Sequence, residues 1–139
     1  MHDKRPDGAE RLMLPPGGEI PNNQRLPVLL HRAALPAGDP GAAEALFASH
    51  GWPPAWRNGI YDYHHYHPNA HEALAIAAGT GHRNLGASPD LLVVGAYPPG
   101  AEPEEYTGLP GESERAAEAI PATPDPPSDP VTGRPYPGA

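Results

Sequence analysis

The sequence contains no cysteine, which excludes disulfide bonds and thiolate metal ligands. A chain without disulfides suits a reducing compartment, so we expect it in the cytoplasm. No apolar run approaches the roughly 18 residues of a membrane-spanning helix. The first ten residues, MHDKRPDGAE, lack the apolar stretch of a signal peptide. The sequence therefore predicts a protein with neither a membrane segment nor a leader.

Basic residues are scarce. Nine Lys and Arg stand against 17 Asp and Glu, which gives a formal net charge of −8 at pH 7. A surface that binds nucleic acid needs clustered positive charge to neutralise phosphates, and the sequence has no such cluster. We therefore expect no nucleic-acid partner.

Aromatic residues are also few, whereas proline and glycine are abundant. Phe47 is the only phenylalanine, so the core must rest on Leu, Val, Ala and a few Tyr and Trp. The 22 prolines and 16 glycines are 38 of 139 residues, or about 27%, a share typical of loop-rich or disordered chains. The length suits one domain, and the composition predicts that only part of the chain folds.

Three regions differ in composition. Residues 1–13 are polar and predict a flexible N-terminus. Residues 14–100 contain the apolar segments and predict a single domain. From Pro98 onward there are eleven prolines, and eight acidic residues against two arginines. Such a composition is typical of disorder, so residues 101–139 are predicted to be a disordered acidic tail.

One helix and four strands are predicted within the central region. Asp39 as N-cap, Pro40 at the first helical position and Gly51 as the stop predict a short helix over residues 41–50. Apolar or alternating segments predict strands at residues 26–32, 59–67, 72–78 and 91–97. The pattern indicates an all-β domain with one short N-terminal helix.

Five of the eight histidines lie within residues 59–82, GIYDYHHYHPNAHEALAIAAGTGH. His65 and His67 are two residues apart, so on a strand they share a face about 6.6 Å apart. A Pro-Asn turn then allows Glu72 to fold back toward them. Two imidazoles and a carboxylate at one point are ligands that divalent transition metals prefer. We therefore predict a metal site made by His65, His67 and Glu72.

The neighbouring side chains have other expected roles. Tyr61 and Tyr63 share the parity of the two histidines and are expected on a cavity wall, with Tyr63 a candidate for outer contact with the site. His64 and Tyr66 are expected on the opposite face of the strand. His71 is an alternative ligand if the turn shifts by one residue.

The spacing of these residues resembles the first motif of the cupin superfamily. The matching pattern is Gly59, five residues, His65, Tyr66, His67, four residues, Glu72, six residues and Gly79. The stretch GTGH, which ends at His82, resembles the end of the second cupin motif, whose histidine is usually the fourth ligand. The segments IPNNQRLP, WRNGIYDYHHYH, GTGHRNLGAS and LLVVGAYPPG are similar to a group of small bacterial single-domain cupins, the YjlB-like proteins.

This resemblance implies an RmlC-like jelly roll, the double-stranded β-helix of cupins, with one metal ion held by His65, His67, Glu72 and His82. In cupins further strands separate the two motifs, whereas here Gly79 belongs to both. The missing strands correspond to about 15–25 residues, so the barrel is expected to be incomplete. If a hairpin forms directly across residues 79–81, Glu72 lies about 20 Å along the strand from the partner of His82. The role of His82 therefore stays open.

These patterns leave three functions open. The first is a small-molecule enzyme of the dioxygenase or isomerase type that uses one divalent ion, Fe, Mn, Zn or Ni. The second is a non-catalytic cupin that binds a metal or a ligand, and the third is a degenerate cupin without activity. No catalytic residue is assigned. Exposed sheet edges make a homodimer an expected assembly.

Overall fold

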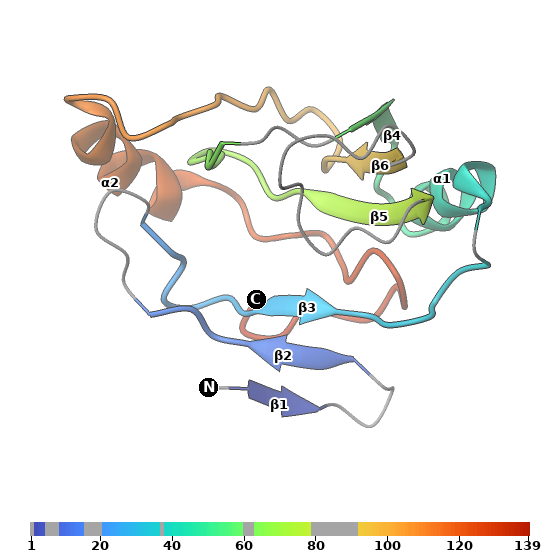
Figure 1. Ribbon diagram of the computed structural model, residues 1–139. Coiled ribbons are helices and arrows are strands. Elements are labelled where there is room, and N and C mark those ends of the chain that lie inside the picture. Colours follow the sequence, from blue (N-terminus) through green and yellow to red (C-terminus); the bar gives the residue numbers. More distant parts are fainter. Residues whose placement is uncertain (1, 5–8, 16–20, 37, 60–62, 79–91) are drawn as a thin grey trace.

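The computed structural model describes residues 2–4, 9–15, 21–36, 38–59, 63–78 and 92–139, which form two three-stranded antiparallel sheets and two helices (Figure 1). The first sheet has the order β1-β2-β3, with β1 at His2–Lys4, β2 at Glu10–Leu12 and β3 at Val28–Leu30. The second has the order β4-β6-β5, with β4 at Pro54–Asn58, β5 at Ala73–Ala78 and β6 at Leu92–Ala96. The helices are α1 at Pro40–Ser49 and α2 at Glu112–Ala122.

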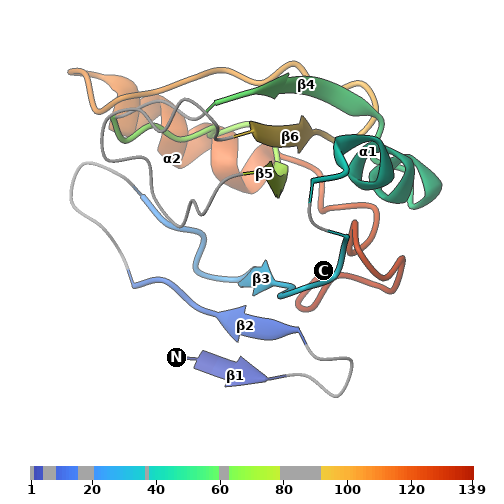
Figure 2. The same cartoon turned by 45° about the vertical axis from the view of Figure 1, so that its right-hand side comes forward.

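The two sheets are separate, and the described residues do not close into a barrel. Figures 1 and 2 show the β1-β2-β3 sheet below the other sheet, with α1 and α2 toward opposite ends of the molecule. The C-terminal residues run beside β3, where the Tyr136 hydroxyl donates to the Pro27 carbonyl at 2.5 Å. The sheet-rich architecture that the sequence predicts is present. The more specific fold, a jelly roll, stays a prediction.

The core lies between α1 and the β4-β6-β5 sheet. In the central strand β6, Val93 and Val94 are adjacent and both fully buried, so both faces of this strand are covered. Phe47 from α1 and Trp52 from the following loop are each 2% exposed. The buried cluster consists of Ala43, Phe47, Trp52, Ala73, Ala75, Val94 and Ala96.

Helix α1 confirms the helix predicted from the capping residues. The Asp39 carboxylate accepts the Ala42 N–H at 2.9 Å, and Pro40 occupies the first turn. Gly51 follows the last turn with φ of +83°, a conformation that glycine adopts without strain. Neither α1 nor α2 has the length and apolar character needed to span a bilayer, and these are the helices of the described residues.

Gly95 allows β4 and β6 to approach closely. It pairs with Trp56 across the two strands, and a Cβ built on Gly95 would overlap the Trp56 indole. We therefore predict that Gly95→Ala lowers the free energy of unfolding by about 1–3 kcal/mol, since overpacking forces the ring or the strand to move. Gly59→Ala is the matched control, because a Cβ there meets no atom within 4 Å. Urea unfolding of both variants tests this, and equal stabilities would contradict it.

Other elements differ from the predictions. Strands β5 and β6 confirm the strands predicted at 72–78 and 91–97, and β3 lies within the strand predicted at 26–32. The predicted flexible N-terminus instead carries β1 and β2, where β1 pairs with β2 and β2 pairs with β3. Pro54 begins β4, as an edge strand tolerates. This strand ends at Asn58, and the described part of the predicted 59–67 strand, Gly59 and residues 63–67, is irregular with one isolated bridge.

The predicted disorder of the acidic tail is wrong for the described residues 101–139. This segment contains α2 and the buried side chains of Tyr106, Glu112, Ala116 and Asp129. Glu112 organises the start of α2, because its Oε1 accepts the N–H groups of residues 107, 108 and 109. Burial alone would raise the pKa of Glu112, but these donors hold it below its usual value. Composition predicts disorder poorly here because polar side chains supply the order by bonding to the backbone.

Candidate functional site

The site is built where the histidine-rich residues 63–72 meet a segment that follows β6. Tyr66 and Tyr106 form an antiparallel bridge, with N–H to carbonyl distances of 2.9 Å in both directions. Asn69 continues the contact, because its side chain donates to the Glu102 carbonyl at 2.9 Å and accepts the Glu104 N–H at 2.8 Å. These bonds fix residues 102–106 in register beside residues 66–69.

The bridge sorts the side chains onto two faces. The rings of Tyr66 and Tyr106 pack edge to face, with centroids 5.7 Å apart. Side chains alternate along extended backbone, so His65 and His67 lie on the other face. Their rings are 5.3 Å apart, and the ring of Tyr63 lies 6.0 Å from that of His65. The prediction of a shared face for His65 and His67 agrees with this packing.

His67 and Glu72 form the centre of the site. Nε2 of His67 lies 3.1 Å from Oε2 of Glu72, and the two side chains are 12% and 17% exposed. Nδ1 of His67 lies 2.8 Å from the Glu104 carbonyl. Because a carbonyl only accepts, Nδ1 carries the proton and Nε2 is the nitrogen directed at Glu72.

The two groups shift each other's pKa. The hydrogen bond to Glu72 raises the pKa of His67 above its usual value, against the effect of burial. Burial would raise the pKa of Glu72, but its bonds to His67 and Tyr97 hold it lower. The pair therefore favours a charged imidazolium beside a carboxylate.

Tyr97 and Trp56 support Glu72 from behind. Hydrogen bonding with the Tyr97 hydroxyl lowers the pKa of Glu72, and the nearby Trp56 lowers the pKa of Tyr97. Burial, followed by the Glu72 bond, raises the pKa of Tyr97 to about 12, so this hydroxyl keeps its proton. The Tyr97 ring also packs edge to face on His67 at 5.7 Å. This network links the site to the close approach at Gly95.

His65 has an acidic neighbour of its own. Its Nε2 lies 3.7 Å from Oε1 of Glu105, with the side chains 22% and 39% exposed. The site thus contains two imidazole–carboxylate pairs side by side, one partly buried and one nearer the solvent.

The remaining predicted residues are distributed differently. His82 and Tyr61 lie outside the described residues. His71 belongs to another environment, since its Nε2 lies 2.9 Å from the Pro124 carbonyl and burial lowers its pKa. Tyr63 stands beside His65 and is 47% exposed, and His64 is exposed.

The donors lie as two separate imidazole–carboxylate pairs. Two donors at about 2.1 Å from an ion lie about 3.0 Å apart at right angles and about 3.6 Å apart at 120°. The separations of 3.1 Å for His67–Glu72 and 3.7 Å for His65–Glu105 match these values. The His67 Nδ1 bond to a carbonyl is the support that metal-binding histidines commonly have. As placed, no three acidic or imidazole side chains of the described residues converge on one ion position.

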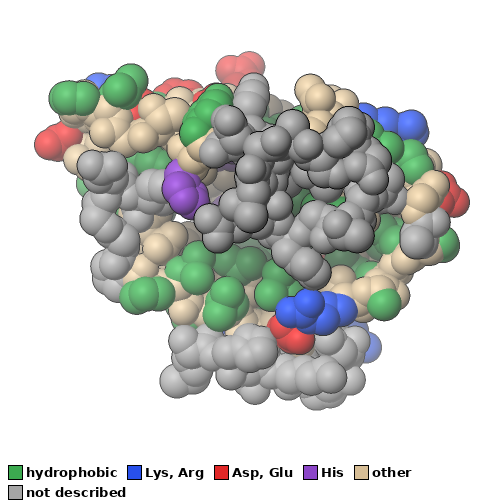
Figure 3. All heavy atoms as spheres, viewed as in Figure 1, with side chains coloured by type: hydrophobic (Ala, Val, Ile, Leu, Met, Phe, Trp, Pro, Cys, Tyr) green, Lys and Arg blue, Asp and Glu red, His purple; other side chains and the backbone are tan. Residues whose placement is uncertain are grey.

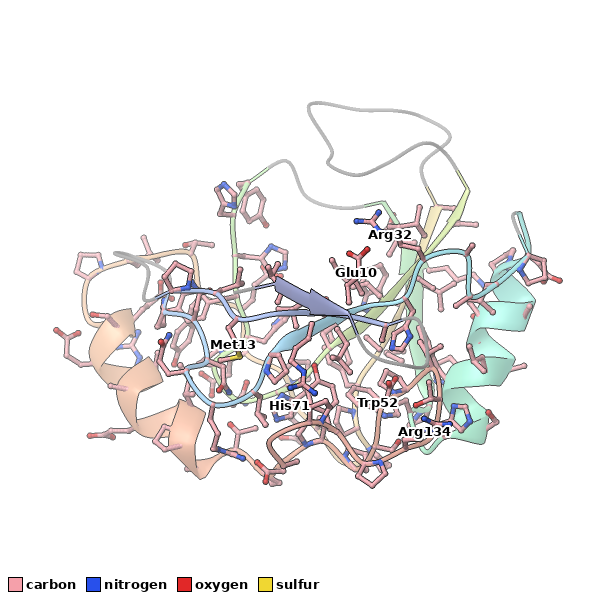
Figure 4. All side chains as sticks on the ribbon, turned by 90° about the horizontal axis from the view of Figure 1, so that it is seen from below. Glu10, Met13, Arg32, Trp52, His71 and Arg134 are labelled. Carbon is pink, nitrogen blue, oxygen red and sulfur yellow. The ribbon has the colours of Figure 1, made fainter. Side chains whose placement is uncertain are left out.

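A cavity of about 820 Å³ opens between β3 and β5, and Glu72 lies on its wall. Its lining includes Val28 and Leu30 from β3 and Leu74 and Ile76 from β5, which are 37–48% exposed. Figure 3 shows hydrophobic side chains gathered over β3. Arg32, also on the wall, is paired with Glu10 at 3.0 Å, and Figure 4 shows the two side chains together.

Sequence reasoning missed the residues that support the site from a distance. Tyr97 ends an apolar strand, and Glu104 and Glu105 lie in the segment predicted to be disordered. The sequence of residues 104–106, two glutamates followed by a tyrosine, has no alternation of polar and apolar residues that would have indicated a strand.

Comparison with known proteins identifies a relative but no described activity. No protein-family model matches the chain, and no solved structure matches it. "Uncharacterized protein YjlB" of Bacillus subtilis (strain 168) is 35% identical over 153 aligned positions, which cover 91% of this chain and 92% of YjlB. Because 91% of 139 residues is about 126, about 27 aligned positions have no counterpart in this chain. Identity at this level and over this length shows that the chain belongs to the family of YjlB.

Proposed function

We propose that this chain is a cupin-type protein that binds one divalent transition metal ion through His65, His67 and Glu72. The observation that carries the proposal is the arrangement of His67, whose Nδ1 donates to a backbone carbonyl while Nε2 faces Glu72 at 3.1 Å. The spacing of the residues, which resembles the first cupin motif, supports the same set. Imidazole and carboxylate donors suit Fe, Mn, Zn or Ni.

His82 stays a predicted further ligand outside the described residues. The gap of about 27 positions relative to YjlB is compatible with the strands expected to be missing between the two motifs. If the gap lies there, His82 reaches the ion only by a path different from that of a complete cupin.

The cavity beside Glu72 favours a small-molecule enzyme over a purely structural metal site. An ion held at Glu72 would border an apolar cavity large enough for a small molecule. There the ion would act as a Lewis acid or oxygen-activating centre. The chain's own contribution is to bind the apolar part of the ligand through Leu74 and Ile76. The Tyr97 hydroxyl keeps Glu72 oriented.

We predict that His67→Ala abolishes stoichiometric metal binding. Wild-type protein is expected to hold about one ion per chain, and loss of the His67 imidazole should lower affinity by about 100-fold or more, since even outer-contact losses cost 10–100-fold. Metal content by elemental analysis and titration with Zn(II) or Mn(II) measure this. His64→Ala is the matched control, because His64 is an exposed histidine of the same segment.

Circular dichroism of each variant separates lost binding from lost folding. If folded His67→Ala protein carries as much metal as the His64→Ala control, the proposed function is wrong.

A further inference from the structure

Another imidazole–carboxylate pair lies on the wall of the large cavity, outside the proposed metal site. Asp129 is fully buried, and its Oδ2 lies 3.1 Å from Nε2 of His31, whose side chain is 10% exposed. Both residues line the cavity between β3 and β5. The contact with Asp129 directs Nε2 of His31 away from a ligand. Nδ1 is therefore the ring nitrogen that can form a hydrogen bond to a molecule in the cavity.

The charged side chains on the described part of the wall are already paired with opposite charges. A charged group of a ligand would lie in the cavity without a counter-ion, and a buried unpaired charge is strongly unfavourable. The charge balance of the wall therefore favours an uncharged ligand. The pairs are His31 with Asp129 at 3.1 Å, Arg32 with Glu10 at 3.0 Å, and Glu72 with His67 at 3.1 Å.

The rest of the described wall is mainly apolar. Val28 and Leu30 come from β3, and Leu74 and Ile76 come from β5. Figure 3 shows hydrophobic side chains gathered in this region. The volume of about 820 Å³ is within the usual range of sites that hold small organic molecules. An apolar cavity with one buried polar group suits a ligand that is apolar except at one end.

We propose that this cavity binds an uncharged small molecule with an apolar body and one hydroxyl or carbonyl oxygen, which bonds to Nδ1 of His31. Imidazole serves either group, because a bare Nδ1 accepts from a hydroxyl and a protonated Nδ1 donates to a carbonyl. The inference rests on the part of the proposed function that places a small molecule beside Glu72. It does not depend on a metal ion.

Octanol, octanoate and octylamine provide the first test, because they share a chain and differ in the charge of one end at pH 7. Isothermal titration calorimetry measures the affinity of the wild-type protein for each. We expect octanol to bind at least about 10-fold more tightly than either charged probe, since the wall offers no unpaired counter-charge. No octanol binding, or equal binding of a charged probe, would overturn the inference.

A variant that fills the cavity tests where octanol binds. Ile76→Trp adds volume at the wall and should lower octanol affinity by about 10-fold or more, since the ring and the ligand compete for the same space. Leu109→Trp is the matched control, because Leu109 is 63% exposed and is not among the residues that line the cavity. Equal octanol affinities of the two variants would place binding elsewhere and contradict the proposal.

A double variant, His31→Phe with Asp129→Asn, tests the polar contact. It removes the imidazole nitrogens without leaving a buried carboxylate unpaired, and Asp129→Asn alone is its control because it keeps His31. We expect the double variant to bind octanol about 2–10-fold more weakly than the control, the effect of one hydrogen bond. Equal affinities of the two proteins, with folding checked by circular dichroism, would overturn the role of His31. If the double variant does not fold, the probe series and Ile76→Trp decide.

Metal titration of the same protein separates this inference from the proposed metal site. Protein that binds Zn(II) but not octanol would overturn the inference alone. Protein that binds octanol in the expected order but no metal would support the inference and overturn the metal site.

Discussion

Trp52→Ala is expected to lower the free energy of unfolding by about 3–5 kcal/mol, the usual cost of removing a fully buried aromatic side chain. Trp52 is 2% exposed and belongs to the cluster that joins α1 to the β4-β6-β5 sheet. Its indole N–H also donates to the Ser128 carbonyl at 3.2 Å, so the same side chain anchors the C-terminal segment. Urea unfolding monitored by circular dichroism measures the loss.

Two further variants divide this effect into its parts. Trp52→Phe retains much of the ring volume but removes the bond to Ser128, so we expect about 1–2 kcal/mol of destabilisation. Leu109→Ala tests an apolar residue that is 63% exposed and should change stability by less than about 0.5 kcal/mol. If Trp52→Ala were no more disruptive than Leu109→Ala, the placement of Trp52 in the core would be wrong.

Removal of residues 124–139 is expected to abolish cooperative unfolding. The segment joins the region around β3 to the loop after α1 through side-chain and backbone contacts. Those contacts are Arg25 with Asp125, Arg25 with the Gly138 carbonyl, Tyr136 with the Pro27 carbonyl, His31 with Asp129, Ser128 with the His50 carbonyl, and His50 with the Pro130 carbonyl. Without them one wall of the cavity is lost and Trp52 becomes exposed. Thermal unfolding and tryptophan fluorescence of the shortened chain test this.

Point variants show whether this effect comes from specific contacts. Asp129 is fully buried, its Oδ1 accepts the Val131 N–H at 2.9 Å, and its Oδ2 lies 3.1 Å from Nε2 of His31. Asp129→Ala should cost about 1–3 kcal/mol, because it leaves the buried Val131 N–H without its acceptor. Asp125→Ala, which breaks an exposed ion pair with Arg25, should have little effect. If the shortened chain melts as cooperatively as the full chain, the prediction of a disordered tail from composition would be correct.

The composition of this tail misleads for a physical reason. Proline and acidic residues lower the apolar area available for burial, which is why they predict disorder. Here order comes from backbone groups bound by a few buried polar side chains, as with Glu112 and Asp129. Such bonds depend on which distant groups lie nearby, and residue counts contain no such information.

Local patterns determined the elements of this protein that depend on neighbouring residues. The capping residues around α1, the apolar runs of β5 and β6, and the alternation that puts His65 and His67 on one face are all short-range properties. Membership of the YjlB family agrees with the resemblance carried by the same short segments.

Tertiary structure alone decided which groups surround those histidines. Glu104, Glu105 and Tyr97 lie 30 or more positions away along the chain. The two glutamates reach the site because the Tyr66–Tyr106 bridge and the hydrogen bonds of the Asn69 side chain hold residues 102–106 against residues 66–69. It also decided that two small sheets, rather than a closed barrel, carry the described residues. Contacts between distant segments depend on the packing of the whole chain, whereas periodicity in the sequence reports only which way each side chain points along its own strand.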